Sequence, residues 1–429
     1  MGFGPLRSFP TEDLVRRTNA SLITTIAVGL LAASGVGVSA QEPEPVSGLE
    51  APAMAAPTPR TTDDLLASSV TEDVEPGVIR VRNDGVRKLT RKLRSVESFN
   101  SVYIVAGTDG SVWQVGGDQL IKLGDPAVHA WPSDIPRLAI DEEFTVSADG
   151  VLWLSVPKSR PSSFGPAHSS WKFDGESWER VSVAPEQRAS FGVEAHPDGT
   201  TLALTSTGVY RLDDAVPALV SPFGDQGEVP RWRSADLRIT DDGALWLVPE
   251  DGLDFYRDGG NGWERIDDSG LRAQLPAAFS TSGVAEVRAD ISSGGTIWAY
   301  ISAGADRSES GGVITDRVLA RLDGSDWSTW GSADGVPVLT FNAIEDSVIA
   351  SADGSVWAVP AARDSAGERS CDGIVNFDGT TWTHYLEGRC VHDYDIALDG
   401  AAWVLAGDTR DRAKDPVSTY AIRPRQTPE

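Results

Sequence analysis

Short segments of alternating apolar and polar residues recur along this chain, and a common turn signature follows them. A glycine is preceded by Asp in six copies and by Gly294 in the fifth, with a large apolar residue three positions later. The seven glycines are Gly110, Gly150, Gly199, Gly243, Gly295, Gly354 and Gly400. Because Asp-Gly favours a turn with positive φ and period-2 alternation is typical of half-buried strands, each copy predicts a β-hairpin.

The segment before each turn indicates an innermost strand. The fourth and sixth residues before the glycine are apolar in all seven copies, as in Ile104/Ala106, Val193/Ala195 and Val348/Ala350. The small residues at several of these positions suit strands that crowd around an axis. We expect these seven strands to surround a central channel.

The spacing of the repeat defines the fold class. Successive turn glycines lie 40 to 59 residues apart, which is the length of a four-stranded sheet with its turns. A second hairpin, again with Trp three residues after a glycine, follows at Gly175, Gly324 and Gly379, and in a looser form at Gly260–Trp263. Two hairpins per repeat predict an all-β, seven-bladed β-propeller of four-stranded antiparallel blades.

The two ends of the repeat region predict how the ring closes. Only one further strand, around Ser418–Arg423, follows the last turn, whereas Ile79–Lys88 precedes the first complete repeat. We expect N-terminal strand material to complete the C-terminal blade and to cover its exposed edge. The number of donated strands, one or two, stays open.

The repeat resembles the two-component-regulator propeller repeats. The resemblance rests on Asp-Gly-x-x-Trp followed by Phe377-Asp378-Gly379 and then Trp382-Thr-His-Tyr385, and it covers about Gly77 to Arg423. It implies an extracytoplasmic, sensor-like recognition module. Streptogramin lyases are more distantly similar, and that resemblance implies the alternative of a metal-assisted lyase or hydrolase whose histidine and glutamate lie at the channel mouth. His392 is expected at the start of an innermost strand, whereas His129, His168 and His384 are expected in outer strands or loops.

The N-terminal region predicts export. Residues 22–38 are apolar and uncharged, Arg16 and Arg17 precede them, and Ser39-Ala40 offers a cleavage site. Residues 1–40 therefore indicate a signal peptide or a signal anchor, which would tether the chain to a membrane. Residues 41–75 are rich in Pro, Ala and acid and indicate a flexible linker. The propeller is expected over 76–424, with a tail at 425–429.

The net charge and the cysteine content exclude several classes of binding partner and site. The formal net charge of −26 argues against nucleic acid, whose phosphates a binding protein must neutralise. A polar small molecule, a cell-envelope polymer or a protein remain as partners. Two cysteines exclude a disulfide-dense scaffold and a four-cysteine zinc site. No catalytic motif is found, and the sequence assigns no catalytic residues.

Charged residues fall on the face of the innermost strands opposite the apolar stripe. They occupy the fifth and seventh positions before the turn glycine: Glu143, Glu194, Asp236, Arg238, Arg288, Asp290, Asp393 and Asp395. Six carboxylates and two guanidiniums could form an acidic ring for a polar ligand or a divalent cation in the axial channel. Alternatively, the charges pair with one another and line a wet channel. No other cofactor is predicted.

Cys371 and Cys390 flank the second hairpin of the sixth repeat and are expected to form a disulfide in an oxidising compartment. Seven basic residues gather at the start of the propeller: Arg80, Arg82, Arg87, Lys88, Arg91, Lys92 and Arg94. They indicate either a patch for anionic envelope components or an edge strand protected by positive charge.

Overall fold

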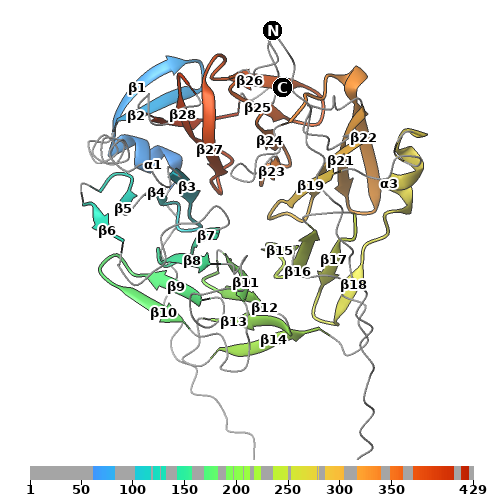
Figure 1. Ribbon diagram of the computed structural model, residues 1–429, viewed down its shortest axis with the longest axis horizontal. Helices are drawn as coiled ribbons and strands as arrows, with labels where there is room; N and C mark the ends of the chain where they lie inside the picture. The colour runs from blue at the N-terminus through green and yellow to red at the C-terminus, as the bar shows by residue number, and fades with distance from the viewer. Residues whose placement is uncertain are drawn as a thin grey trace, which may run out of the picture. The chain divides into compact units, whose positions relative to one another are not determined.

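Seven β-sheets are arranged around a common axis (Figure 1). The computed structural model describes residues 61–82, 102–116, 119–125, 127–131, 143–156, 169–181, 190–196, 198–205, 207–212, 217–223, 235–249, 253–277, 279, 286–303, 316–339, 348–360, 371–409 and 417–424. The segments at 22–38, 41–60 and 425–429, expected to be the export signal, most of the linker and the tail, lie outside these residues. Within the described residues, no helix has the length and apolar character needed to cross a membrane.

Six blades are formed by four consecutive antiparallel strands each. Blade 1 contains β3 (Val102–Ala106), β4 (Val112–Gly116), β5 (Gln119–Lys122) and β6 (His129–Ala130). Blade 2 contains β7 (Glu143–Val146), β8 (Leu152–Val156), β9 (Ser169–Phe173) and β10 (Trp178–Val181). Blade 3 contains β11 (Ser190–Ala195), β12 (Thr201–Thr205), β13 (Gly208–Arg211) and β14 (Ala218–Pro222).

The second half of the ring repeats this arrangement. Blade 4 contains β15 (Ala235–Ile239), β16 (Leu245–Pro249), β17 (Tyr256–Asp258) and β18 (Trp263–Arg265), and α3 (Ser269–Gln274) follows it. Blade 5 contains β19 (Glu286–Ile291), β20 (Ile297–Ala303), β21 (Asp316–Asp323) and β22 (Asp326–Gly331), followed by the 3₁₀ turn η2 (Ser332–Asp334). Blade 6 contains β23 (Val348–Ala350), β24 (Val356–Ala358), β25 (Ile374–Phe377) and β26 (Trp382–Tyr385).

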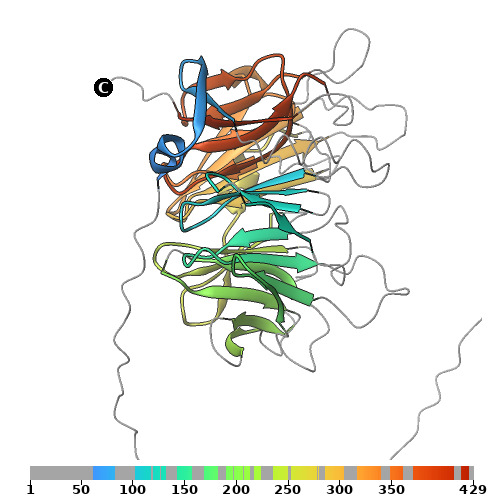
Figure 2. The ribbon, with the colours of Figure 1, turned by 90° about the vertical axis from the view of Figure 1, so that its left-hand side faces the viewer.

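Blade 7 closes the ring with strands from both ends of the propeller region. It contains β27 (Cys390–Ile396), β28 (Ala402–Gly407) and β29 (Ser418–Ile422), and β2 (Val78–Arg82) pairs antiparallel with β29 as the fourth strand. The predicted closure is therefore confirmed. A fifth strand, β1 (Val70–Glu75), pairs with the outer side of β2, so two strands are donated. Figure 2 shows β1 and the short helix α1 (Thr62–Ala67) against this part of the ring.

The folded region begins earlier than the boundary at residue 76. The segment expected to be a linker contains a helix capping box. The Thr61 side chain accepts a hydrogen bond from the Asp64 N–H, and the Asp64 carboxylate accepts one from the Thr61 N–H. Leu65 is only 1% exposed and packs in the same apolar cluster as Trp403. These two contacts order residues that composition alone assigns to a linker.

The position of β1 also changes the interpretation of the basic segment. Arg80 and Arg82 lie in β2, which is covered by β1, so the prediction that they protect an edge strand is wrong. Arg82 pairs with Glu72 of β1, and Arg80 donates a hydrogen bond to Ser418 Oγ at 2.6 Å. The other five basic residues, from Arg87 to Arg94, lie outside the described residues.

The turn signature forms the same structure in every blade. All seven turn glycines have φ between 73° and 97°, a region that L-residues with side chains rarely adopt. The aspartate before the glycine accepts a hydrogen bond from the residue after it, as between Asp198 and the Thr200 N–H at 2.8 Å. The repeated Asp-Gly pair is therefore explained by turn geometry.

Neighbouring blades are joined by the large residue three positions after each turn glycine. Trp113 of blade 1 packs on Phe173 of blade 2, and Trp298 of blade 5 packs on Phe377 of blade 6, both with ring centroids 5.9 Å apart in an edge-to-face arrangement. These contacts bury the aromatic surface of one blade against the third strand of the next. They form the core between the sheets.

Closure by β2 predicts a difference between two valine substitutions. Val78→Ala removes a fully buried side chain from β2 and should lower the free energy of unfolding by about 2 kcal/mol, because it leaves a cavity at the closing strand pair. The matched control is Val74→Ala in β1, where the side chain is 47% exposed and the change should stay within about 0.5 kcal/mol. Urea unfolding of the two variants makes the comparison, and equal losses would contradict the assigned closure.

Candidate functional site

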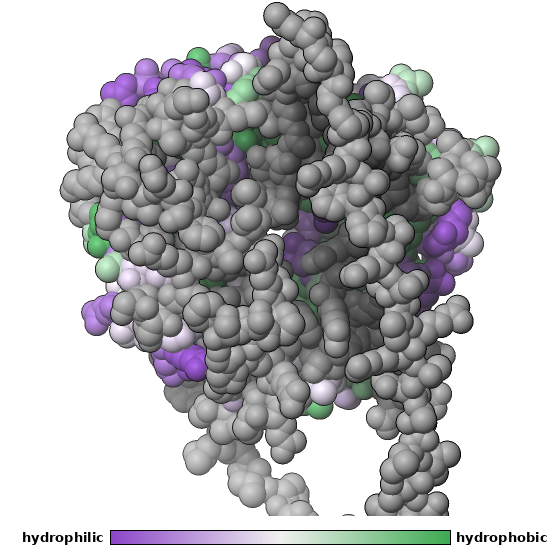
Figure 3. All heavy atoms as spheres, viewed as in Figure 1, coloured by the Kyte–Doolittle hydropathy of each residue, from purple (hydrophilic) through white to green (hydrophobic). Residues whose placement is uncertain are grey.

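Charged residues occupy the predicted positions of the innermost strands in five of the seven blades. Viewed along the axis, the molecular surface is hollowed at its centre and hydrophilic residues are visible inside the hollow (Figure 3). Blades 1 and 6 contribute Tyr103, Val105 and Ile349 at the equivalent positions instead of charges. The charges therefore form an incomplete ring.

Three of the predicted carboxylates bind the backbone of the next blade. Asp290 accepts a hydrogen bond from the Ala350 N–H at 2.9 Å, and Asp395 accepts one from the Ala106 N–H at 2.7 Å. Asp393 accepts one from the Ile104 N–H at 2.6 Å. An innermost strand is also a sheet edge, with N–H groups that its own sheet leaves unpaired. These aspartates supply acceptors for that edge, so they have a structural role.

Arg238 of β15 connects three blades. Its Nε donates a hydrogen bond to Asp290 Oδ1 of blade 5 at 2.8 Å, and its Nη1 lies 3.9 Å from Glu194 Oε2 of blade 3. Burial opposes the charge of Arg238, but the carboxylates of Asp290, Glu194 and Asp236 raise its pKa above the usual value. The guanidinium therefore stays protonated between them.

Glu194 of β11 differs from its equivalents. It occupies the same repeat position as Asp290 and Asp395, yet within the described part of the chain it accepts no hydrogen bond from the next blade. Its longer side chain is 23% exposed, and its one ion-pair partner among the described residues is Arg238. Glu194 is therefore the carboxylate of this group that the fold does not use for bonding the backbone.

The surroundings of Glu194 make it titrate near neutral pH. Burial raises the pKa of Glu194 to about 7, and the charges of Asp290, Asp395 and Asp236 add to the rise, while Arg238 lowers it. The same influences show that these four side chains lie within electrostatic reach of Glu194. We refer to Glu194, Asp236, Arg238, Asp290 and Asp395 as the axial cluster.

The remaining predicted residues are less informative. Arg288 lies in β19 at the predicted position and is partly buried, and Glu143 is the first residue of β7. Among the described residues, no group of three or more His, Cys, Asp or Glu side chains is placed to hold a metal ion. The divalent cation of the sequence analysis therefore has no preformed ligand set in this part of the chain.

The histidines are distributed largely as expected. His129 lies in the outer strand β6, where its ring packs edge-on against Phe173 at 5.1 Å, and His384 lies in the outer strand β26. His392 is buried in the innermost strand β27, and His168 lies outside the described residues. The buried Nε2 of His196 lies 3.0 Å from the Thr240 carbonyl oxygen.

The predicted disulfide is confirmed. Cys371 precedes β25 in blade 6 and Cys390 begins β27 in blade 7, with a Cα–Cα distance of 4.3 Å. The bond closes a 19-residue separation and joins the two last blades covalently. It lies outside the axial cluster and stabilises the ring near its point of closure.

Comparisons with known proteins return similar propellers at low identity. No protein-family model and no curated protein sequence matches the chain. Among solved structures, a virginiamycin B lyase from Staphylococcus aureus is 13% identical over 77% of this chain and 97% of its own, with a TM-score of 0.47. The extracellular domain of a hybrid two-component system from B. thetaiotaomicron is 10% identical over 77% of this chain and 40% of its own, with a TM-score of 0.45.

A third similar structure is the propeller domain of the Trilobed protease from Pyrococcus furiosus. It is 13% identical over 76% of this chain and 96% of its own, with a TM-score of 0.45. At these values the likenesses carry no functional argument. The sheet order described above establishes the seven-bladed fold on its own.

The raised pKa of Glu194 predicts a pH-dependent effect of Glu194→Gln. The folded protein binds a proton more tightly than the unfolded chain, whose glutamate has a pKa near 4.5, so this residue destabilises the fold as pH rises from 4.5 to 7. The penalty at pH 8 should reach at most about 3 kcal/mol. Glu194→Gln should therefore raise the free energy of unfolding at pH 8 and change it little at pH 4.5.

Urea unfolding at the two pH values measures this difference. Glu264→Gln, in the outer strand β18, is the matched control because Glu264 is exposed, and it should have no comparable effect. A Glu194→Gln variant with the same stability change at both pH values would show that the axial cluster does not perturb this carboxyl group.

Proposed function

We propose that this chain is an extracytoplasmic, sensor-like binding module that recognises a small ammonium-bearing ligand at the axial cluster. The observation that carries the proposal is Glu194, a desolvated carboxylate whose partner within the described residues is a single guanidinium at 3.9 Å. A positively charged ligand would supply the missing partner. Binding would then favour the ionised form of Glu194.

The charge balance of the cluster supports a cationic ligand. The axial cluster contains four carboxylates and one guanidinium, and Arg238 is already bonded to Asp290 at 2.8 Å. Ion pairs in partly desolvated sites are less screened by salt than pairs at the surface. The net charge of −26 would add long-range attraction for cations.

The disulfide and the N-terminal sequence, rather than the comparisons, support a location outside the cytoplasm. The Cys371–Cys390 disulfide is typical of oxidising environments outside the cytoplasm. The apolar segment at 22–38 agrees with export, either as a cleaved signal or as an anchor. A ligand of this module would then come from the cell envelope or the surrounding medium.

Calorimetric titration with 1,4-diaminobutane tests the proposal, since this diammonium ion stays doubly charged between pH 5.5 and 8. The probe should bind the full chain at pH 8 and bind at least tenfold more weakly at pH 5.5, where Glu194 is mostly protonated. Glu194→Gln should abolish the pH dependence and weaken binding at pH 8 to the level of pH 5.5. Glu264→Gln should bind as the wild type does.

Failure to bind at pH 8, or equal binding by the wild type and Glu194→Gln, would overturn the proposal. Calcium chloride in the same experiment tests the divalent cation. Saturable calcium binding that Glu194→Gln removes would replace the ammonium ligand with a metal ion and refute this part of the proposal.

A further inference from the structure

The interface between blades 3 and 4 lacks the tryptophan that the other interfaces use. The position three residues after the turn glycine holds Trp in six blades and Leu202 in blade 3. The six tryptophans are Trp113, Trp153, Trp246, Trp298, Trp357 and Trp403. Each of them is buried and faces the next blade around the ring.

The residue facing this position is also exceptional in blade 4. It lies on the third strand of the next blade or directly after it, beside the residue two positions after that blade's own turn glycine. In chain order the seven residues are Leu123, Phe173, Leu212, Asp258, Leu322, Phe377 and Ile422. Asp258 is the one polar residue among them, and it faces the blade that has Leu202. Both members of the usual apolar pair are therefore replaced at the same interface.

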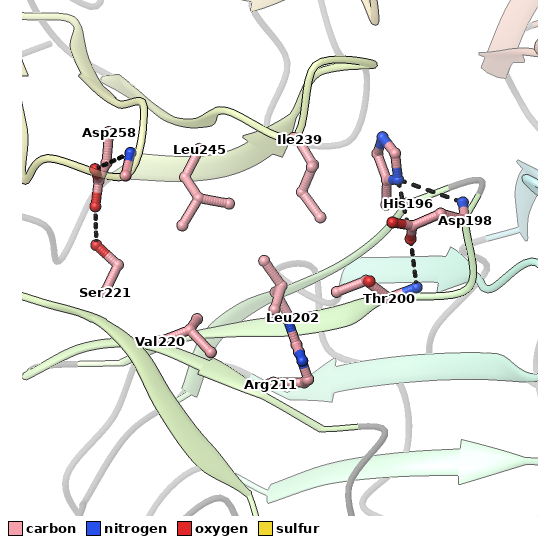
Figure 4. A pocket seen from close by; sticks show the side chains of 12 residues that line it. His196, Asp198, Thr200, Leu202, Arg211, Val220, Ser221, Ile239, Leu245 and Asp258 are labelled. Carbon is pink, nitrogen blue, oxygen red and sulfur yellow. Dashed lines mark hydrogen bonds and ion pairs between the residues drawn. The ribbon is translucent and has the colours of Figure 1, made fainter. Parts of the chain in front are cut away.

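A cavity occupies the space that this exchange leaves open. Its volume is about 260 Å³, and Leu202, Ile239, Leu245 and Val220 form its apolar walls. Figure 4 shows Asp258 and Ser221 at one end of the cavity and His196 and Asp198 at the other. Gly243 and Gly260 also line the cavity, and no atom of the described residues lies within 4 Å of where a Cβ would stand on either glycine.

The interface is closed elsewhere, so the cavity is a local feature. Leu204, Val209, Leu237 and Leu247 form a buried cluster between the two blades together with Leu202. Nearer the outside, Phe223 and Trp263 pack with ring centroids 5.6 Å apart. The opening is therefore bounded by packed contacts and does not result from separation of the blades.

Arg211 occupies the position from which a cation covers the tryptophan ring in other blades. It pairs with Leu202 across β12 and β13, and the same position in three other blades holds a cation that covers the tryptophan ring. These cations are Lys122 over Trp113 at 5.3 Å, Arg257 over Trp246 at 5.5 Å and Arg321 over Trp298 at 5.6 Å. Blade 3 keeps the cation and loses the ring. An aromatic ring in the cavity would restore this cation–π contact.

Asp258 supplies a charge inside the cavity. It is 8% exposed, and its carboxylate accepts hydrogen bonds from the Gly260 N–H at 2.8 Å, the Gly262 N–H at 3.0 Å and the Ser221 hydroxyl. These donors are all neutral, and no Lys or Arg of the described residues forms an ion pair with Asp258. A carboxylate has about four acceptor positions, so one more donor can bind.

We propose that the cavity between blades 3 and 4 binds a small aromatic ammonium ion. The ring lies between Leu202, Ile239 and Leu245, beside Arg211, in the space that the other interfaces fill with a tryptophan and an apolar residue. The ammonium group binds Asp258. This site is separate from the axial cluster, so it does not depend on the function proposed above. The compact volume limits the ligand to one or two rings.

Tryptamine is the probe, with indole-3-acetate as the ring-matched anion. Calorimetric titration of the full chain should show saturable tryptamine binding and at least tenfold weaker binding of indole-3-acetate. Leu202→Trp should place a ring in the cavity and reduce tryptamine binding at least tenfold. Leu398→Trp is the matched control, because Leu398 lies at the equivalent turn of blade 7 and is 37% exposed, and it should leave binding unchanged.

Asp258→Asn provides a second variant that keeps the size of the side chain and the acceptor for the Gly260 and Gly262 N–H groups. It should weaken tryptamine binding at least fivefold and leave the binding of neutral indole unchanged. Glu194→Gln separates the two sites, because tryptamine bound at the axial cluster would depend on Glu194, whereas the tryptamine binding that Leu202→Trp removes should persist in Glu194→Gln.

Each contrary result would overturn the proposal. Absence of tryptamine binding, or unchanged binding in folded Leu202→Trp, would show that the cavity is not the site. Equal binding of indole-3-acetate, or an unchanged affinity for tryptamine in Asp258→Asn, would exclude the ammonium contact. Loss in Glu194→Gln of the same tryptamine binding that Leu202→Trp removes would move the ligand to the axial cluster.

Discussion

The packing of one large residue per blade onto the third strand of the next blade is the contact on which the ring depends. Sheets of this kind have two apolar faces, and each face must be covered by a neighbour. The Asp-Gly turn fixes the position of the tryptophan that follows it, so the same short motif both folds a hairpin and sets a blade-to-blade joint. Six such joints, the apolar cluster around Leu202 between blades 3 and 4, and the strand pairing of β2 with β29 close the ring.

Closure around an axis creates a second constraint, because every blade ends in an unpaired innermost edge. Asp290, Asp393 and Asp395 provide acceptors for the edge of the following blade. The acidic residues around the axis are therefore explained in part by the fold. Glu194 departs from this role, because within the described residues it accepts no such hydrogen bond, and burial raises its pKa to about 7.

Much of the fold follows from the sequence, because turn chemistry and period-2 alternation are local signals. The sequence analysis predicts the seven turns and the closure of the ring from these signals, and it predicts the disulfide from the two cysteines that flank one hairpin. The helix α1 and strand β1 were not, since the order of residues 61–75 depends on tertiary contacts of Leu65 and on pairing with β2. The face of the axial charges was also predictable, but their partners come from neighbouring blades and require the three-dimensional arrangement.

The cavity between blades 3 and 4 is a second feature that the sequence alone does not predict. Leu202 is visible in the sequence as the one exception to the tryptophan repeat. Asp258 becomes meaningful only with the register of β16 and β17, which aligns it with Phe173 and Phe377. The role of Leu202 in place of tryptophan therefore depends on Asp258, which faces it from the next blade.

The joint itself is tested most directly by urea unfolding of Trp298→Leu. This substitution reproduces at the interface of blades 5 and 6 the residue found at position 202. Trp298 is fully buried, packs on Phe377 and donates a hydrogen bond to the Gly354 carbonyl at 3.2 Å. The account predicts that the free energy of unfolding falls by about 3 kcal/mol. A loss below about 1 kcal/mol would contradict the claim that these tryptophans hold neighbouring blades together.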